Sequence, residues 1–156
     1  MILVSSCLAG VACRYNGSHS LQEKIEALVA AKQAVMACPE LLGGFSTPRE
    51  PAEIQGGNGE DVLDGKARIL ERSGRDVTEL YLEGAYKTLE MARQIGASCV
   101  VLKENSPSCG SSYIYDGQFA NRRKSGEGVT AALLRREGFR VLNEQELALL
   151  SETNMP

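Results

Sequence analysis

Three cysteines each follow a short apolar run, and this placement constrains the fold more than any other feature of the sequence. They are Cys7, Cys38 and Cys109. Short continuous apolar runs are typical of strands that are buried on both faces of a parallel sheet. Because α/β proteins place their sites at the carboxyl ends of parallel strands, we expect the three thiols to meet along one edge of a sheet.

A loop rich in small polar residues, 103–112, carries the third of these cysteines. Asn105, Ser106, Pro107 and Ser108 cannot continue a strand, because proline has no N–H for a ladder hydrogen bond and its neighbours favour turns. We therefore expect the chain to leave the sheet near residue 103 and to present Cys109 on a loop.

The remaining patterns predict a single α/β domain over residues 1–156, a three-layer Rossmann-like sandwich with a mostly parallel sheet. Glycine pairs and prolines indicate an irregular loop, followed by a hairpin, at about residues 41–72. In that hairpin we expect residues 62–63 to pair with residues 67–71. The other expected strands are 2–6, 33–37, 99–103, 113–117 and 139–142, with helices at 20–31, 78–95, 127–137 and 144–150 and a loop at 117–127.

Composition excludes several classes of function. A net charge of −3 and a pI near 5.3 argue against general nucleic-acid binding. No apolar run approaches the roughly 18 residues that a membrane-spanning helix needs. The first residues lack a positively charged leader and are interpreted as the first core strand, so we expect a cytoplasmic protein.

The cysteines favour metal binding or catalysis over disulfides. Their number, five, is odd, and the chain is long enough to build a core without covalent cross-links. With a single histidine, His19, ligation by thiolates alone is the simplest arrangement. Three thiolates on an iron–sulfur cluster would leave one iron open as a Lewis acid, whereas zinc would need a fourth ligand from Cys13 or a carboxylate. Cys99 lies inside an apolar run and is interpreted as structural.

Charged side chains near the same edge are candidates for catalysis and binding. Glu40 directly follows Cys38-Pro39, where a carboxylate can act as a general acid or base, although a solvated glutamate at a helix start fits the pattern equally. Arg14, Arg49 and Lys103 can bind a carbonyl or anionic group of a substrate, or can be ordinary surface residues.

Five motifs occur in order along nearly the whole chain. They are Ser5-Ser6-Cys7-Leu8-Ala9-Gly10, Cys13-Arg14-Tyr15-Asn16-Gly17, Cys38-Pro39-Glu40 with Gly43-Gly44 and Thr47-Pro48-Arg49, Lys103-Glu104-Asn105-Ser106-Pro107-Ser108-Cys109-Gly110, and Gly126-Glu127-Gly128-Val129-Thr130. Together they resemble the iron–sulfur-dependent thiouracil desulfidases. The chain departs from that family at Asn16, where aspartate is usual.

The resemblance implies a 4Fe-4S cluster held by Cys7, Cys38 and Cys109. Cys13, which lies in the same loop as Cys7, is a possible further ligand, but the family often has valine at its position. The resemblance also implies a catalytic glutamate at Glu40 and a catalytic serine at Ser106, with Ser108 as the alternative. The implied reaction is a non-redox desulfidation of a thiolated pyrimidine such as 2-thiouracil, which yields uracil and hydrogen sulfide. We accordingly expect a small thiolated base as partner, rather than a nucleic acid or a membrane.

Two other functions stay open from sequence alone. One is a non-catalytic zinc or iron–sulfur module in which Cys7, Cys13, Cys38 and Cys109 close a four-thiolate site without an open coordination position. The other is a thiol-based sulfur carrier, which needs a reactive cysteine beside a cation, as Cys13 is beside Arg14.

Overall fold

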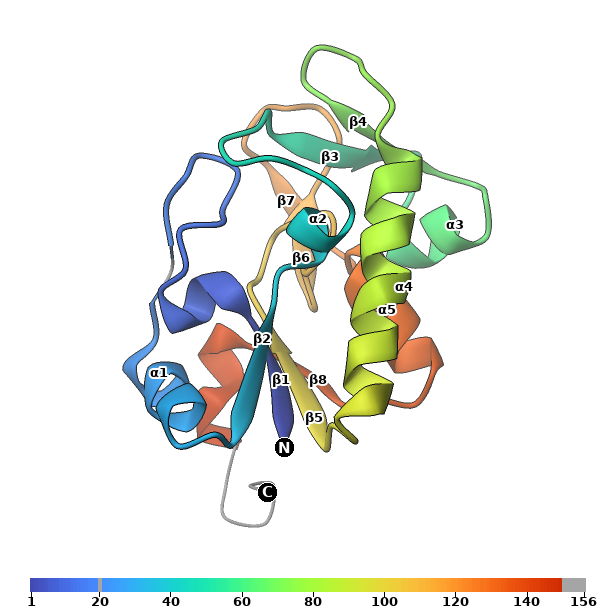
Figure 1. The fold of residues 1–156 in the computed structure, drawn as a ribbon. Helices are drawn as coiled ribbons and strands as arrows, with labels where there is room; N and C mark the ends of the chain where they lie inside the picture. Colours follow the sequence, from blue (N-terminus) through green and yellow to red (C-terminus); the bar gives the residue numbers. More distant parts are fainter. Residues whose placement is uncertain (20, 150–156) are drawn as a thin grey trace.

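A four-stranded parallel sheet forms the centre of the molecule (Figure 1). The computed structural model describes residues 1–19 and 21–149. The strand order is β2 (Ala34–Ala37), β1 (Ile2–Ser5), β5 (Cys99–Leu102) and β8 (Val141–Asn143). Each pair of neighbours is parallel, so the predicted mostly parallel sheet is confirmed.

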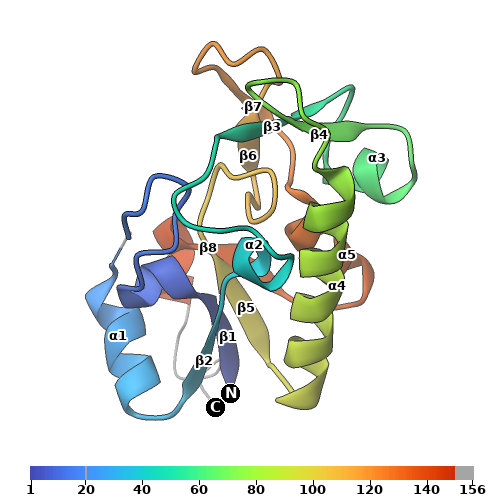
Figure 2. The same ribbon diagram turned by 45° about the horizontal axis from the view of Figure 1, so that its top comes forward.

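Helices cover both faces of this sheet, as Figures 1 and 2 show. On one face α4 (Thr78–Gln94) and α5 (Val129–Arg136) enclose Leu3 and Val100 in the larger apolar core. On the other face α1 (Glu23–Ala30) packs over Ile2, Val4, Cys99 and Val101. Neighbouring strand residues point to opposite faces, so each central strand contributes to both cores. The predicted three-layer α/β sandwich is confirmed.

Helix α4 follows the helical period that the sequence predicts. Its buried residues recur at the spacing of one helix face: Tyr81, Gly84, Ala85, Thr88, Leu89 and Ala92. The opposite face is polar. Within residues 1–19 and 21–149, no helix is both long and apolar enough to cross a membrane.

The segment 52–71 differs from its prediction. β3 (Ala52–Gln55) pairs antiparallel with β4 (Arg68–Glu71), whereas residues 62–63, the predicted partner, lie in α3 (Gly59–Leu63). The helix forms because Asn58 accepts hydrogen bonds from the N–H groups of Glu60 and Asp61, while the Asp61 carboxylate accepts one from the N–H of Asn58. This reciprocal capping stabilises a first helical turn next to a glycine cluster. The predicted pairing was therefore wrong.

Smaller differences occur near the carboxyl terminus of the chain. β6 (Tyr113–Tyr115) was expected, but its antiparallel partner β7 (Arg123–Ser125) lies where we predicted only a loop. The helix predicted at 144–150 is a 3-10 helix, Glu144–Leu149, and its predicted last residue lies outside the described residues. The predicted start of the first helix, residue 20, also lies outside them.

Candidate functional site

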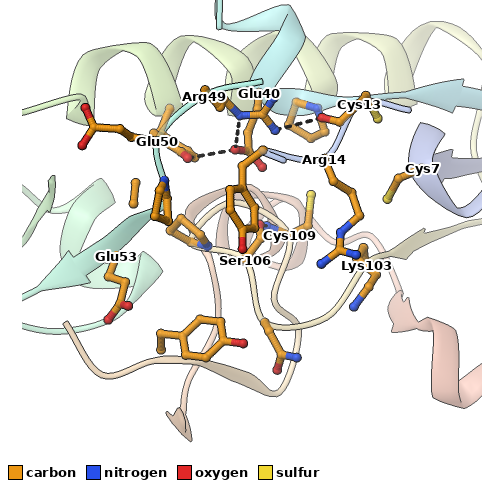
Figure 3. A pocket seen from close by; sticks show the side chains of 18 of the residues that line it. Cys7, Cys13, Arg14, Glu40, Arg49, Glu50, Glu53, Lys103, Ser106 and Cys109 are labelled. Atoms are coloured by element: carbon orange, nitrogen blue, oxygen red, sulfur yellow. Dashed lines mark hydrogen bonds and ion pairs between the residues drawn. The ribbon is translucent and has the colours of Figure 1, made fainter. Parts of the chain in front are cut away.

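A cavity of about 510 Å³ lies where β1, β2 and β5 end. Cys7, Cys38 and Cys109 line it, together with Cys13. These three strands are neighbours in the sheet, so the segments that follow them leave the sheet side by side. The structure thus brings together the thiols that the sequence places after separate apolar runs. Figure 3 shows Cys7 and Cys109 among them.

The four cavity cysteines are free thiols, three of them buried. The neighbouring Cys38 thiol lowers the pKa of Cys13, but the Cys7 thiol and burial outweigh this effect and raise that pKa to about 11. Burial, followed by the charge of Glu40, raises the pKa of Cys109 to about 12. A metal centre that binds these sulfurs must therefore displace their protons.

The donor set fits an iron–sulfur cluster. Thiolates are the usual ligands of such clusters, and soft sulfur suits iron. The cavity volume is in the range of sites that enclose a group much larger than an ion. Among residues 1–19 and 21–149, no three His, Cys, Asp or Glu side chains are grouped as they would be around one metal ion.

Glu40 is oriented by two hydrogen-bond donors. It lies in the first turn of α2 (Pro39–Leu42), which begins with proline at the position that proline favours. Its Oε2 accepts a hydrogen bond from Arg49 Nε at 3.0 Å and another from the Tyr81 hydroxyl at 2.9 Å. In the part of the chain that the structure describes, Oε1 makes no hydrogen bond. One carboxylate oxygen is thus held, and the other remains for a ligand.

Close packing of α2 on α4 brings Tyr81 to this carboxylate. A Cβ atom at Gly84 would collide with the carbonyl oxygen of Pro39, and one at Gly43 with that of Leu80, so only glycine permits the approach. The Tyr81 ring packs against Phe45 with their centroids 4.8 Å apart. Burial, and then the charge of Glu40, raises the pKa of Tyr81 well above its usual value, so the hydroxyl remains a donor.

Arg49, predicted to bind substrate, is engaged within the protein. Besides its ion pair with Glu40, its Nη2 donates to the carbonyl oxygen of Cys13 at 3.0 Å, and its Nη1 donates to Thr47 Oγ1 at 3.3 Å. The guanidinium therefore connects Glu40 to the loop that carries Cys13. The structure gives it the contacts of a positioning group rather than those of a free cation.

The two serines predicted to be catalytic occupy different environments. Ser106 lines the cavity, and its Oγ accepts hydrogen bonds from the N–H groups of Ser108 and Cys109. Ser108 is 1% exposed and is not part of the cavity lining. Its hydroxyl is hydrogen-bonded to Thr130 Oγ1 at 2.7 Å and contacts the Cys109 sulfur at 3.8 Å. Of the two, Ser106 is therefore the one that can reach a bound molecule.

Lys103 and Arg14 supply positive charge to the cavity wall. Lys103 forms an ion pair with Glu144 at 3.2 Å and donates to the carbonyl oxygen of Glu104. The half-buried Arg14 has no ion-pair or hydrogen-bond partner for its side chain among the described residues. Figure 3 shows its guanidinium directed into the cavity. Arg14 is thus the more available cation for a ligand.

Sequence reasoning missed two important residues of this region. From sequence, Tyr81 belongs only to the helix expected at residues 78–95, although a tyrosine near the start of that helix places a hydroxyl near the carboxyl edge of the sheet. Glu104 was treated as an ordinary residue of its motif. Its buried carboxylate accepts hydrogen bonds from three backbone N–H groups of residues 111–113 and from Asn143, a role for which the sequence carries no local signal.

Comparisons with known proteins agree over nearly the whole chain. The family model described as 2-thiouracil desulfurase matches residues 2–146. The uncharacterized protein YbbK of Bacillus subtilis (strain 168) is 68% identical over 147 residues, which cover 94% of this chain and 97% of that protein. The solved structure of the 4Fe-4S-dependent thiouracil desulfidase TudS matches with a TM-score of 0.86 at 41% identity, covering 96% of this chain and 93% of that one.

Proposed function

This chain belongs to the 2-thiouracil desulfurase family, and we propose that it is a hydrolytic desulfidase that removes sulfur from thiolated pyrimidines such as 2-thiouracil. One observation carries the proposal: thiols from three neighbouring strand ends share a cavity with Glu40, whose carboxylate is held by two donors. Ordinary structural cysteines would not require such a carboxylate beside them.

We infer that Cys7, Cys38 and Cys109 hold a 4Fe-4S cluster; the solved relative TudS is described as 4Fe-4S-dependent. When bound, such a cluster would supply an iron without a cysteine ligand, which is a Lewis acid with affinity for the sulfur of the substrate. Cys13 is in contact with two of the three proposed ligands, but we assign it no necessary part in holding the cluster.

The proposed reaction needs no oxidant or reductant. Water adds to the thiocarbonyl carbon, a C–O bond forms, and the C–S bond breaks. The oxygen of water becomes the new carbonyl oxygen, and both of its protons leave with sulfur as hydrogen sulfide. A thiolated base plus water therefore balances against the oxo base, uracil in the case of 2-thiouracil, plus hydrogen sulfide.

Glu40 is the proposed general base. Arg49 and Tyr81 hold Oε2, so Oε1 has a defined direction from which to accept a proton from the attacking water. General acid–base groups of this kind typically contribute about 10²–10⁴-fold to a rate.

Ser106 is the proposed proton relay. Its oxygen already accepts two backbone hydrogen bonds, so its own O–H remains to be donated to a group in the cavity. A ring nitrogen or the departing sulfur is a suitable acceptor. Ser108 instead supports Cys109 from the protein side. Arg14 is the proposed partner for a ring carbonyl oxygen, and Lys103 adds positive charge.

Anaerobic reconstitution of the protein tests this function. We expect the visible absorption of an iron–sulfur cluster, together with stoichiometric sulfide and uracil from 2-thiouracil. Glu40→Gln should keep the absorption and lose about 100-fold or more of the turnover. Glu50→Gln is the matched control. Glu50 lines the same cavity, but both of its carboxylate oxygens accept hydrogen bonds from Ser73.

Three outcomes would contradict the proposal. A fully loaded wild-type protein that releases no sulfide would exclude the desulfidase. An unchanged rate in Glu40→Gln would remove Glu40 from the mechanism. Zinc, rather than iron, as the bound metal of the purified protein would favour the closed four-thiolate module.

A further inference from the structure

Asn105 is a strained residue of the cavity wall. It lies between Glu104 and Ser106, lines the cavity, and has a φ of +80°, which places it in the left-handed region. Residues other than glycine rarely adopt this conformation, because Cβ then crowds the neighbouring carbonyl oxygen. Asparagine is tolerated there chiefly when its side chain forms a hydrogen bond with nearby backbone.

The side chain of Asn105 does not form that compensating bond. Its Oδ1 is buried and has no hydrogen-bond partner. Its Nδ2 likewise makes no hydrogen bond with any residue in the ranges 1–19 and 21–149. The whole carboxamide is thus unpaired at a position where the backbone is strained. Buried polar groups without partners are rare in folded proteins, and they recur at functional sites.

The backbone N–H groups of the surrounding loop do not supply the missing partner. The N–H groups of Ser111, Ser112 and Tyr113 all donate to Glu104. The hydroxyl oxygen of Ser106 accepts from Ser108 and Cys109. Because Asn105 lines the cavity, a molecule bound there becomes the partner of the carboxamide when the side chain turns its buried Oδ1 toward the cavity.

We propose that the Asn105 carboxamide recognises the pyrimidine ring, with Oδ1 accepting a hydrogen bond from ring N3–H and Nδ2 donating one to the adjacent ring oxygen O4. This inference rests on the proposed function. A carboxamide and the N3–H/C4=O edge of a pyrimidine are complementary in donor, acceptor and spacing, as in the bidentate contacts that amide side chains make with nucleic-acid bases. Pairing at this edge leaves the sulfur at C2 free for the thiol side of the cavity.

Binding of uracil, the reaction product, tests the proposal without requiring turnover. Titration calorimetry is carried out on the cluster-loaded protein with uracil and with 3-methyluracil, whose methyl group replaces the N3 hydrogen. We expect N105G to bind uracil at least tenfold more weakly than the wild type. Glycine adopts a positive φ without a steric penalty, so this variant should retain the wild-type unfolding temperature.

Asn121→Gly is the matched control. Asn121 also lines the cavity with a positive φ of 56°, but it is exposed to solvent. We expect this variant to bind uracil as the wild type does. The wild type should also discriminate against 3-methyluracil at least tenfold, and that discrimination should disappear in N105G. In turnover of 2-thiouracil, N105G should raise KM more than it lowers kcat.

Several results would overturn the inference: equal affinity of N105G and the wild type for uracil, equal affinity of the wild type for uracil and 3-methyluracil, or no binding of uracil by the wild type. The two proposals fail separately. If the protein releases sulfide and N105G has the kcat/KM of the wild type, the desulfidase proposal stands and the role of Asn105 in recognition is excluded. If uracil binding depends on Asn105 but no sulfide is released, the role of Asn105 in recognition stands and the desulfidase proposal is excluded.

Discussion

Two loops carry thiols into the cavity, and they are held in different ways. The Cys109 loop (residues 103–112) is built around the buried carboxylate of Glu104, and it is also bonded to the start of α5, where Thr130 N–H donates to the carbonyl oxygen of Ser108. The Cys13 loop (residues 10–18) is closed mainly by its own turns. Its links to the segment around Arg49 are hydrogen bonds between the Cys13 carbonyl and the guanidinium and between the Tyr15 carbonyl and the Arg49 N–H.

This difference separates two tasks. In the Cys109 loop the buried carboxylate of Glu104 accepts hydrogen bonds from several N–H groups. The position of Cys109 is therefore determined by the protein before any ligand binds. The Cys13 loop depends on Arg49, which also forms the ion pair with Glu40. The first loop therefore fixes a proposed cluster ligand, and the second is coupled to the proposed general base.

The largest effect should come from removing the thiol of the rigid loop. We expect Cys109→Ala to abolish cluster binding, and with it all turnover, because no other sulfur is held at that position. Iron analysis and visible absorption after anaerobic reconstitution measure the loss. Cys99→Ala is the control, since Cys99 lies in the apolar core beside α1 and should leave iron content unchanged. A full complement of iron in Cys109→Ala would show that the loop serves another purpose.

Removing the charge at the centre of the Cys109 loop should cost stability. In Glu104→Gln, the amide oxygen can accept the backbone N–H groups that now donate to Oε1, but the amide N–H would face Asn143 Nδ2, which now donates to Oε2. We expect a loss of about 1–3 kcal/mol in the free energy of unfolding. Urea denaturation measures it. Glu53→Gln is the matched control, because Glu53 is also buried and accepts N–H bonds from Gly117 and Phe119. It should destabilise the protein without reducing iron content, whereas Glu104→Gln should reduce both.

The same carboxylate predicts a pH dependence of stability. Burial alone would raise the pKa of Glu104, but hydrogen bonds from Ser112, Tyr113 and Ser111 outweigh it and hold that pKa below its usual value. A carboxylate with a lowered folded-state pKa stabilises the fold above its unfolded pKa of about 4.3, and this contribution is lost as the pH falls through the folded value. From pH 6 to pH 3, the wild type should therefore lose stability more steeply than Glu104→Gln. Parallel curves would exclude this role.

A smaller effect is expected on the Glu40 side. Tyr81→Phe removes one of the two donors to Oε2 but keeps the ring that packs on Phe45. We expect kcat to fall about tenfold, equivalent to about 1.4 kcal/mol, with KM and iron content nearly unchanged. Steady-state kinetics with 2-thiouracil measure it. Tyr86→Phe, an exposed position on the same helix, is the control. A change in KM alone would mean that Tyr81 contacts substrate rather than Glu40.

The features that could be predicted from sequence are those that depend on a local pattern of residues. Continuous apolar runs predicted β1, β2 and β5, and parallel strands necessarily carry the following cysteines to one edge. The motifs also predicted the resemblance to thiouracil desulfidases, which the family match confirms. These features depend on local pattern, and the pattern is strong in the segments that form the sheet.

Contacts between distant segments could not be predicted in this way. Glu40 and Tyr81 are 41 positions apart, and Glu104 and Asn143 are 39 apart, so no local pattern indicates either hydrogen bond. The strand pairing around residue 62 failed for a different reason. The side chains of Asn58 and Asp61 cap a helix there, and this local signal was overlooked beside the glycines.

The smallest effect should follow removal of the thiol in the other loop. Cys13→Ala deletes a side chain that contacts Cys7 and Cys38, but it keeps the backbone carbonyl to which Arg49 donates. Because the link to Glu40 runs through that carbonyl, we expect iron content and turnover within about twofold of the wild type, close to the resolution of a single rate measurement. Loss of iron in this variant would instead identify Cys13 as a required ligand. The protein would then be the closed four-thiolate module without an open coordination position, and both loops would serve to hold the metal centre.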